Sequence, residues 1–190
     1  MILSKTESEC WFQHARFSMP ALVPLHWEGS FEHCIPGLIS RYQNICRKGF
    51  PGLVFTHFRT TCNQWCTRSR FGADATKCPF GCGHDNDKLS HIACCSAFWH
   101  CFCNILGMPA FCLGLEDALL MRNHQGDLDD DASLIFLLGL HVCFLTFNAL
   151  RHGAQFSPAR IRHCVRQYAL THPKIRPFIG RSWSIQISLQ

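Results

Sequence analysis

The chain has 190 residues, which is enough for one domain of ordinary size, or one domain with a small appendage, and excludes a large multidomain enzyme. Hydrophobic residues make up 47% of it and charged residues 16%, whereas about 25% of a typical soluble domain is charged. The chain can therefore bury a sizeable core under a thinly charged surface. This composition excludes intrinsic disorder over most of the sequence.

Charge is distributed unevenly along the chain. Residues 1–77 contain nine Lys/Arg and five Asp/Glu, residues 78–131 contain two and eight, and residues 132–190 contain seven and none. The three parts therefore carry net charges of +4, −6 and +7. Basic ends of this kind attract polyanions such as nucleic acid, or an anionic membrane surface, whereas the acidic centre repels them.

Fourteen cysteines raise the question of disulfides. Disulfide-dense scaffolds are usually shorter than this chain, and the N-terminus lacks the apolar core of a signal peptide and carries Glu7 and Glu9. We therefore expect an intracellular, reducing compartment, cytoplasm or nucleus, in which thiols are free to bind metal.

The first half of the chain predicts three helices. Thr6 and Glu9 fit a capping box for a helix that Pro20 ends. From residue 35 to 48 apolar residues recur at spacings of three and four, and Gly49 suits a C-terminal cap. Residues 53–66 are rich in β-branched and aromatic residues, which fit either helix or strand, and we favour a helix.

The second half predicts an irregular segment and four helices. Residues 72–87 hold three glycines, one proline and two closely spaced cysteines, so we expect irregular backbone. Helices follow at 88–105, 115–124, 131–151 and 158–171. The last has a good N-cap in Ser157 and a proline, Pro158, at its first position. The predicted fold class is mainly α, an irregular helical domain.

The stretch 132–150 contains no Asp, Glu, Lys or Arg and is long enough for a membrane span. Several polar residues and Gly139 interrupt it, and the acids before it and bases after it suit the dipole of a soluble helix. We expect a buried core helix, and keep a small membrane protein spanning at 132–150 as an alternative.

A metal site is predicted from the pattern Cys-x3-Cys-x8-His-x3-Cys, which offers Cys78, Cys82, His91 and Cys95 as ligands. Two thiolates come from a glycine-bearing loop, and the other two ligands are four residues apart, on one face of a helix. Three thiolates and one imidazole suit Zn²⁺, and four protein ligands leave no open position for catalysis. The sequence therefore predicts a structural zinc site that pins the loop.

Neighbouring residues leave alternatives open. Cys94 is three residues after His91 and could replace Cys95. His84 could be a ligand or a loop residue, and all these cysteines could instead be buried free thiols, which are common in cores.

The cysteine pattern is also similar to that of a known family. Residues 59–70 read RTTCNQWCTRSR, residues 78–83 read CPFGCG, and Asp87, His91 and Cys95 follow. This order resembles the segment after the polymerase in LINE-type (non-LTR) retrotransposon reverse transcriptases, where an Arg-Thr and Asn-x-Trp helix leads into a CCHC zinc knuckle. Asn148 and Arg151 are similar to a downstream Asn-x-x-Arg motif of that family.

The resemblance covers residues 35–176 and implies a division of the chain. It implies N-terminal helices with a thumb-like remnant at 1–50, an arginine-rich lead-in and knuckle at 51–106, a C-terminal helical region at 107–176, and a tail at 177–190. The first cysteine pair is spaced x3 here, where many family members have x2. The polymerase's aromatic-x-Asp-Asp motif is absent from the sequence, so we expect a non-catalytic segment.

The resemblance implies that the segment binds RNA or single-stranded DNA. Phosphate contacts would come from cations around the knuckle, and an aromatic ring would stack on an unpaired base. The candidates are Arg59, Arg68, Arg70 and Lys77 for phosphates, and Trp65 or Phe80 for stacking. The competing interpretation places the arginines in a solvated turn and Trp65 in the core.

A second basic group consists of Arg151, Arg160, Arg162, Arg166, Lys174 and Arg176. These residues could follow a phosphate backbone or pair with acids such as Glu116, Asp117 and the aspartates at 127–131, and we favour pairing. The predicted function is therefore zinc-dependent, non-catalytic nucleic-acid binding without a small-molecule substrate. The alternative is a helical scaffold with a purely structural zinc and no nucleic-acid partner.

Overall fold

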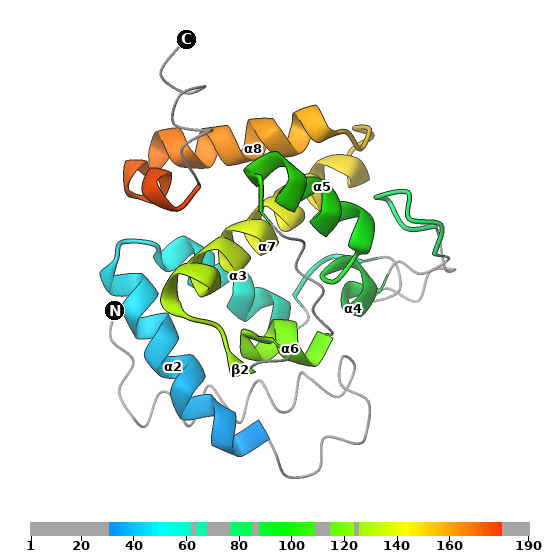
Figure 1. Ribbon diagram of the computed structural model, residues 1–190. Coiled ribbons are helices and arrows are strands. Elements are labelled where there is room, and N and C mark those ends of the chain that lie inside the picture. The colour runs from blue at the N-terminus through cyan, green and yellow to red at the C-terminus, as the bar shows by residue number, and fades with distance from the viewer. Residues whose placement is uncertain are drawn as a thin grey trace.

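The computed structural model (Figure 1) describes residues 31–61, 64–67, 77–84, 88–108, 115–123 and 126–179. Over these residues the chain is mainly helical, as predicted. The helix predicted after Thr6, and the tail beyond residue 179, lie outside the described residues.

The helices are α2 (Phe31–Arg47), α3 (Pro51–Thr61), α4 (Leu89–Ile92), α5 (Ser96–Leu106), α6 (Leu115–Leu120), α7 (Asp130–Arg151) and α8 (Pro158–Thr171), followed by the 3₁₀ helix η2 (Pro173–Phe178). Two short antiparallel strands, β1 (Arg122–Asn123) and β2 (Gly126–Asp127), pair with Arg122 opposite Asp127. Helix α8 has the predicted bounds, with Ser157 as its N-cap.

Helix α7 lies at the centre of the fold, with α2, α3, α5 and α8 packed around it (Figure 1). Every residue from 133 to 140 is buried, because partners cover the helix on all sides. Residues 89–106 and 130–151 are each apolar and long enough to cross a membrane, but 50% and 67% of their most apolar windows are buried inside the fold. Helix α7 is therefore the core helix that the sequence predicted.

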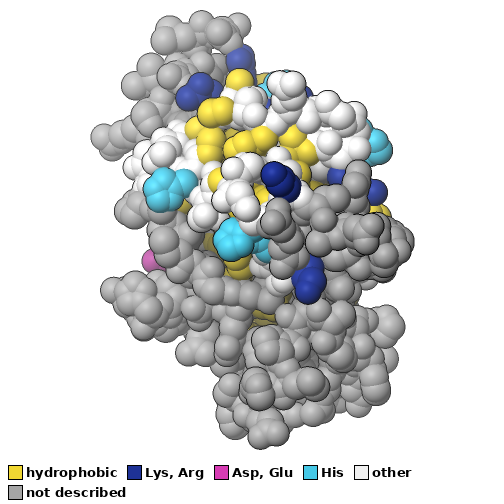
Figure 2. Space-filling model, turned by 90° about the vertical axis from the view of Figure 1, so that its right-hand side faces the viewer, with side chains coloured by type: hydrophobic (Ala, Val, Ile, Leu, Met, Phe, Trp, Pro, Cys, Tyr) yellow, Lys and Arg dark blue, Asp and Glu magenta, His cyan; other side chains and the backbone are white. Residues whose placement is uncertain are grey.

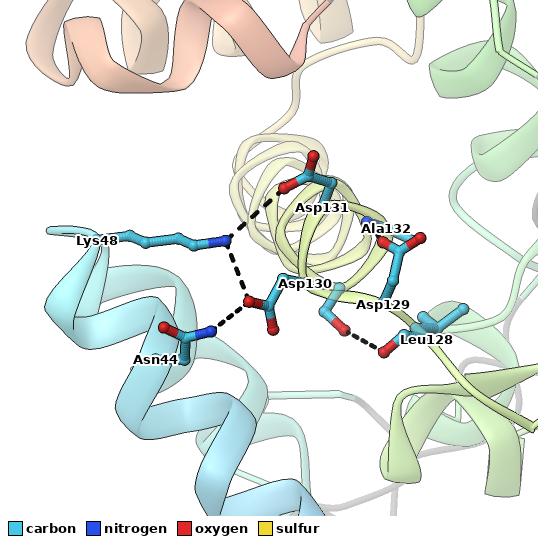
Figure 3. Close-up of polar contacts among 8 residues, drawn as sticks. Asn44, Lys48, Leu128, Asp129, Asp130, Asp131 and Ala132 are labelled. Carbon is cyan, nitrogen blue, oxygen red and sulfur yellow. Dashed lines mark hydrogen bonds and ion pairs between the residues drawn. The ribbon is translucent and has the colours of Figure 1, made fainter.

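The start of α7 is fixed by three consecutive aspartates (Figure 3). The Asp129 carboxylate caps the helix by accepting a hydrogen bond from the Ala132 N–H at 2.7 Å. Lys48 at the end of α2 places its Nζ 3.3 Å from an Asp130 oxygen and 3.7 Å from an Asp131 oxygen, and Asn44 donates to Asp130. These contacts join α2 to the N-terminus of α7.

Helix α5 approaches α7 closely at a glycine. A Cβ built on Gly139 would lie 2.4 Å and 2.7 Å from two carbons of the Trp99 ring and 2.9 Å from a carbon of Phe102. The Trp99 ring stacks on Phe136 at 5.2 Å between centroids, and its Nε1 donates to the Ala93 carbonyl at 2.7 Å. Gly139 is therefore the residue that lets α5 sit against the core helix.

The helix predicted at 88–105 is divided into α4 and α5. The chain turns at Ala93 and Cys94, and Cys95 has extended backbone, φ −60° and ψ 116°, as the N-cap of α5. The Ala93 carbonyl, released by this turn, accepts the indole hydrogen bond of Trp99 instead. A tertiary contact thus replaces the helical hydrogen bonding that the sequence pattern alone predicted.

Two other predicted helices end early. The helix predicted at 53–66 is present as α3 but ends at Thr61, before Trp65. The helix predicted at 115–124 ends at Leu120, because Met121 takes a positive φ of 52° and leads into β1.

A buried polar contact joins α2, α3 and α6. His57, fully buried, donates from Nε2 to the Ala118 carbonyl at 3.0 Å, and its Nδ1 accepts a hydrogen bond from the Tyr42 hydroxyl. Burial lowers the pKa of His57 to about 4, so the ring is neutral near pH 7.

Candidate metal centre

The four predicted ligands converge from three parts of the chain. Cys78 and Cys82 lie in the segment 77–84, here named the cysteine loop, His91 lies on α4, and Cys95 is the N-cap of α5. Their ligand atoms all lie within 4.8 Å of one another. The group could therefore hold a metal ion, although His91 and Cys95 do not share one helix as the sequence suggested.

Two of the distances between ligand atoms can be compared with those around a tetrahedral zinc ion. The Sγ atoms of Cys78 and Cys95 are 3.7 Å apart, and Cys82 Sγ is 3.1 Å from His91 Nε2. Zn–S bonds of about 2.3 Å and Zn–N bonds of about 2.05 Å at tetrahedral angles place two sulfurs roughly 3.8 Å apart and a sulfur and nitrogen roughly 3.6 Å apart. The distance between the Cys78 and Cys95 sulfurs matches the expected sulfur–sulfur distance. The distance from Cys82 Sγ to His91 Nε2 is somewhat shorter than the expected sulfur–nitrogen distance.

Two glycines shape the cysteine loop. Gly81 and Gly83 have φ angles of +73° and +85°, which side chains rarely allow. The Gly81 N–H donates to the Cys78 carbonyl at 3.0 Å, and the Cys78 N–H donates to the His84 carbonyl at 2.8 Å. The chain thus folds back on itself, so that both cysteine sulfurs reach the same point.

An aromatic anchor holds the cysteine loop to the helices. The Phe80 ring is 2% exposed and lies 5.3 Å, between centroids, from both Phe98 of α5 and Phe156 of the turn between α7 and α8. The Phe80 ring therefore attaches the loop to the core.

Burial and mutual contacts shift the pKa values of the cysteines and the histidine of this group. The thiols of Cys78 and Cys95 share a hydrogen bond. This hydrogen bond and burial raise the pKa of the Cys78 thiol far above its usual value, and the same hydrogen bond lowers the pKa of the Cys95 thiol. Burial and the nearby His84 lower the pKa of His91, which favours the neutral imidazole that metals require. A divalent cation at this point would stabilise the thiolate forms of Cys78, Cys82 and Cys95, and so would lower the pKa values of these thiols.

The positions of the side chains favour Cys95 over Cys94 and leave His84 outside the group. The Sγ of Cys95, rather than that of Cys94, belongs to the group of four, and burial raises the pKa of the Cys94 thiol to about 12. His84 is exposed, and its ring lies 4.9 Å from that of His91, outside the group.

The structure does not bring the predicted stacking rings to the surface. Trp65 is fully buried against Phe144 and Phe147 and donates from Nε1 to Thr60 Oγ1 at 3.0 Å. Trp65, like Phe80, is a core residue, because its large ring is buried within the apolar interior. For Trp65 the structure agrees with the competing interpretation, which placed this residue in the core, and Phe80 is buried as well.

The cations predicted to bind phosphate before the site differ in their exposure to solvent. Arg59 is half-buried, with its guanidinium 5.0 Å from the Phe144 ring centroid and 5.9 Å from that of Phe55. Lys77 is exposed at the start of the cysteine loop. Arg68 and Arg70 lie outside the described residues.

The sequence favoured pairing of the second basic group with the aspartates. At residues 129–131 the structure shows other partners. Asp130 and Asp131 pair with Lys48, and Asp129 caps α7. Lys48 takes this place because α2 ends beside the start of α7, a tertiary contact that the charge pattern did not indicate. Side chains at 116, 117 and 127 lie outside the described residues.

Comparison with protein-family models, with curated proteins and with solved structures gives no match. The interpretation of the site therefore rests on its own residues and geometry.

Proposed function

We propose that Cys78, Cys82, His91 and Cys95 bind one Zn²⁺ that has a structural role. The observation that carries this proposal is the convergence of three sulfurs and one imidazole nitrogen within 4.8 Å. Soft thiolates favour zinc over magnesium or calcium, and four protein ligands fill a tetrahedral shell and leave no position for a substrate. The ion would join the cysteine loop to α4 and α5.

Metal analysis of the purified chain tests this proposal. We expect about one zinc per chain, as one closed four-ligand site requires, and loss of that zinc in Cys78→Ser. Cys66→Ser is the matched control, because Cys66 is an exposed free cysteine outside the group. Zinc that persists in Cys78→Ser, or that disappears equally in Cys66→Ser, would contradict the assignment.

Cobalt substitution adds a spectroscopic check. Tetrahedral Co²⁺ bound by three thiolates gives strong charge-transfer and visible absorption, which we expect for the wild type and for Cys94→Ser. If Cys94→Ser lost this signal and Cys95→Ser kept it, the choice of Cys95 as the fourth ligand would be wrong.

We also propose that the chain is a non-catalytic, nucleic-acid-binding segment of a retroelement reverse transcriptase. The support is the resemblance of the cysteine pattern to a retroelement zinc knuckle, together with a net charge of +5 and seven cations without an acid in residues 132–190. Binding would rest largely on phosphate contacts and would weaken with salt. A titration with fluorescent single-stranded RNA and DNA tests it, and absence of binding to both at low salt would contradict it.

The scaffold alternative has one observation in its favour. Trp65 and Phe80, the rings offered for base stacking, are both buried in the core. In that case the zinc would only stabilise a helical interaction module, and the titration would show no binding to either nucleic acid.

A further inference from the structure

The turn between α7 and α8 gathers five basic or histidine side chains within thirteen residues. We name this group the basic corner, and it consists of Arg151, His152, Arg160, Arg162 and His163. Four of them are exposed, and Arg160 is half-buried with its Nε donating to the Gln155 carbonyl at 3.3 Å. No acidic residue follows Asp131 in the sequence, so neither the turn nor α8 contains an acid that could pair with these cations.

The backbone of the turn fixes where these side chains lie. Helix α7 ends with hydrogen bonds from Gly153 and Ala154 to the carbonyls of Leu150 and Ala149, at 3.1 Å each, and Gly153 has a φ of +88°. Helix α8 then begins after the Ser157 cap. The last residues of one helix and the first turns of the next are thereby held together at one end of the helix pair.

The cysteine loop lies on the same side of the molecule as this turn (Figure 1). Phe80 of the loop packs edge to face on Phe156 of the turn, with centroids 5.3 Å apart. On the other side, Arg162 lies near α5, where its charge opposes the burial that raises the pKa of the Cys101 thiol. The cysteine loop thus contacts the turn that carries the basic corner through one aromatic pair, and Arg162 of the corner lies near α5.

Figure 2 views this side of the molecule. Over the part drawn in colour, Lys, Arg and His side chains surround exposed apolar surface, and acidic side chains appear only at the margin. The cations do not form a continuous strip, which suits a few separate phosphate contacts better than a long groove.

We infer that the basic corner, rather than residues 59–70, is the surface that binds the phosphate backbone of single-stranded nucleic acid, and that the metal centre positions it through Phe80 and Phe156. This inference rests on the proposed nucleic-acid-binding function. Charge complementarity selects the partner, since a surface with four exposed basic or histidine side chains matches a polyanion. A zinc dependence of binding then follows without any contact between the ion and the nucleic acid.

The test compares two variants that remove the same charge. Arg151→Gln/Arg162→Gln removes two exposed cations of the corner, and Arg47→Gln/Lys174→Gln removes two exposed cations at the end of α2 and in η2. Binding of a short fluorescent single-stranded RNA is measured by anisotropy between about 50 and 200 mM salt. Single-stranded DNA of the same sequence is the second arm.

We expect the corner variant to lose roughly tenfold or more in affinity at the lowest salt, and its log-log salt slope to become shallower by about 1.4, because each single-strand phosphate contact contributes about 0.7. The control variant should stay within about twofold of the wild type, as removal of distant charges only weakens the general field. Equal losses in both variants, or none in the corner variant, would overturn the inference while leaving the proposed function intact.

Two further outcomes would overturn the inference together with the proposed function. One is that the zinc-loaded wild type binds neither RNA nor DNA. The other is that it binds vesicles of phosphatidylserine and phosphatidylcholine but no nucleic acid, in which case the partner is an anionic membrane surface.

Phe156→Ala tests the link to the metal centre. We expect the variant to retain about one zinc, since no ligand is changed, but to bind RNA several-fold more weakly because the turn loses its contact with Phe80. Full RNA affinity in Phe156→Ala would overturn the positioning role.

Discussion

Gly139→Ala should destabilise the chain, although alanine is the better helix former. The added Cβ would lie 2.4 Å and 2.7 Å from Trp99 carbons and 2.9 Å from a Phe102 carbon. Carbon atoms normally approach to about 3.5–4.0 Å, so the overlap is about 1 Å. Trp99 has little room to move, because it is stacked on Phe136 and its indole is hydrogen-bonded to Ala93.

The size of the effect follows from two opposing contributions. Overpacking of a core costs about 1–3 kcal/mol, and we take the upper value because the added Cβ overlaps two aromatic rings. Alanine recovers about 1 kcal/mol of helix propensity relative to glycine. The net loss in the free energy of unfolding is then about 2 kcal/mol, which lowers Tm by about 4–8 °C for a chain of this size.

Urea and thermal unfolding, followed by circular dichroism with zinc present, measure this loss. Gly52→Ala is the matched control, because Gly52 is also helical and a Cβ there would meet nothing within 4 Å. We expect it to leave stability unchanged or raise it by up to about 1 kcal/mol. If Gly139→Ala were as stable as Gly52→Ala, the close approach of α5 to α7 would be wrong.

Two other predictions concern polar contacts. His57 has a pKa of about 4 when folded and about 6.5 when unfolded, so the unfolded state takes up the proton first and stability falls as pH decreases from 6.5 towards 4. The wild type should lose about 2 kcal/mol more than His57→Gln between pH 7 and pH 5 in urea unfolding, and parallel pH profiles would refute this. Asp129→Ala should cost about 1 kcal/mol through loss of the α7 cap, whereas Asp131→Ala, which removes an exposed ion pair, should cost less than about 0.5 kcal/mol; equal losses would contradict the capping role.

The parts of the fold that local chemistry determines were predictable from the sequence. Helix α8 was predicted to the residue, because Ser157 and Pro158 define its start and its apolar face repeats at helical spacing. Helix α7 was predicted as a core helix, because its polar interruptions and flanking charges fit a soluble helix better than a membrane span. The four residues of the candidate metal centre were predicted to lie together because their spacing is itself a local signal.

The other features of the fold depend on tertiary contacts, which a local sequence pattern does not indicate. The break between α4 and α5 is accompanied by the hydrogen bond from Trp99 to Ala93, within a run of residues whose composition suits one helix. The burial of Trp65 depends on Phe144 and Phe147, about eighty residues later in the chain. The partner of Asp130 is Lys48, which charge counts over segments could not select from the other cations.

Cys95 combines two roles at one backbone position. Its sulfur belongs to the candidate metal centre. Its carbonyl accepts a hydrogen bond from the backbone N–H of Trp99 at 3.0 Å, which is the first helical hydrogen bond of α5. An ion held at this point would fix the torsion angles from which the helix propagates, and so remove part of the nucleation cost of α5. Chelation should consequently be visible as faster amide hydrogen exchange in the first turn of α5, before any global unfolding.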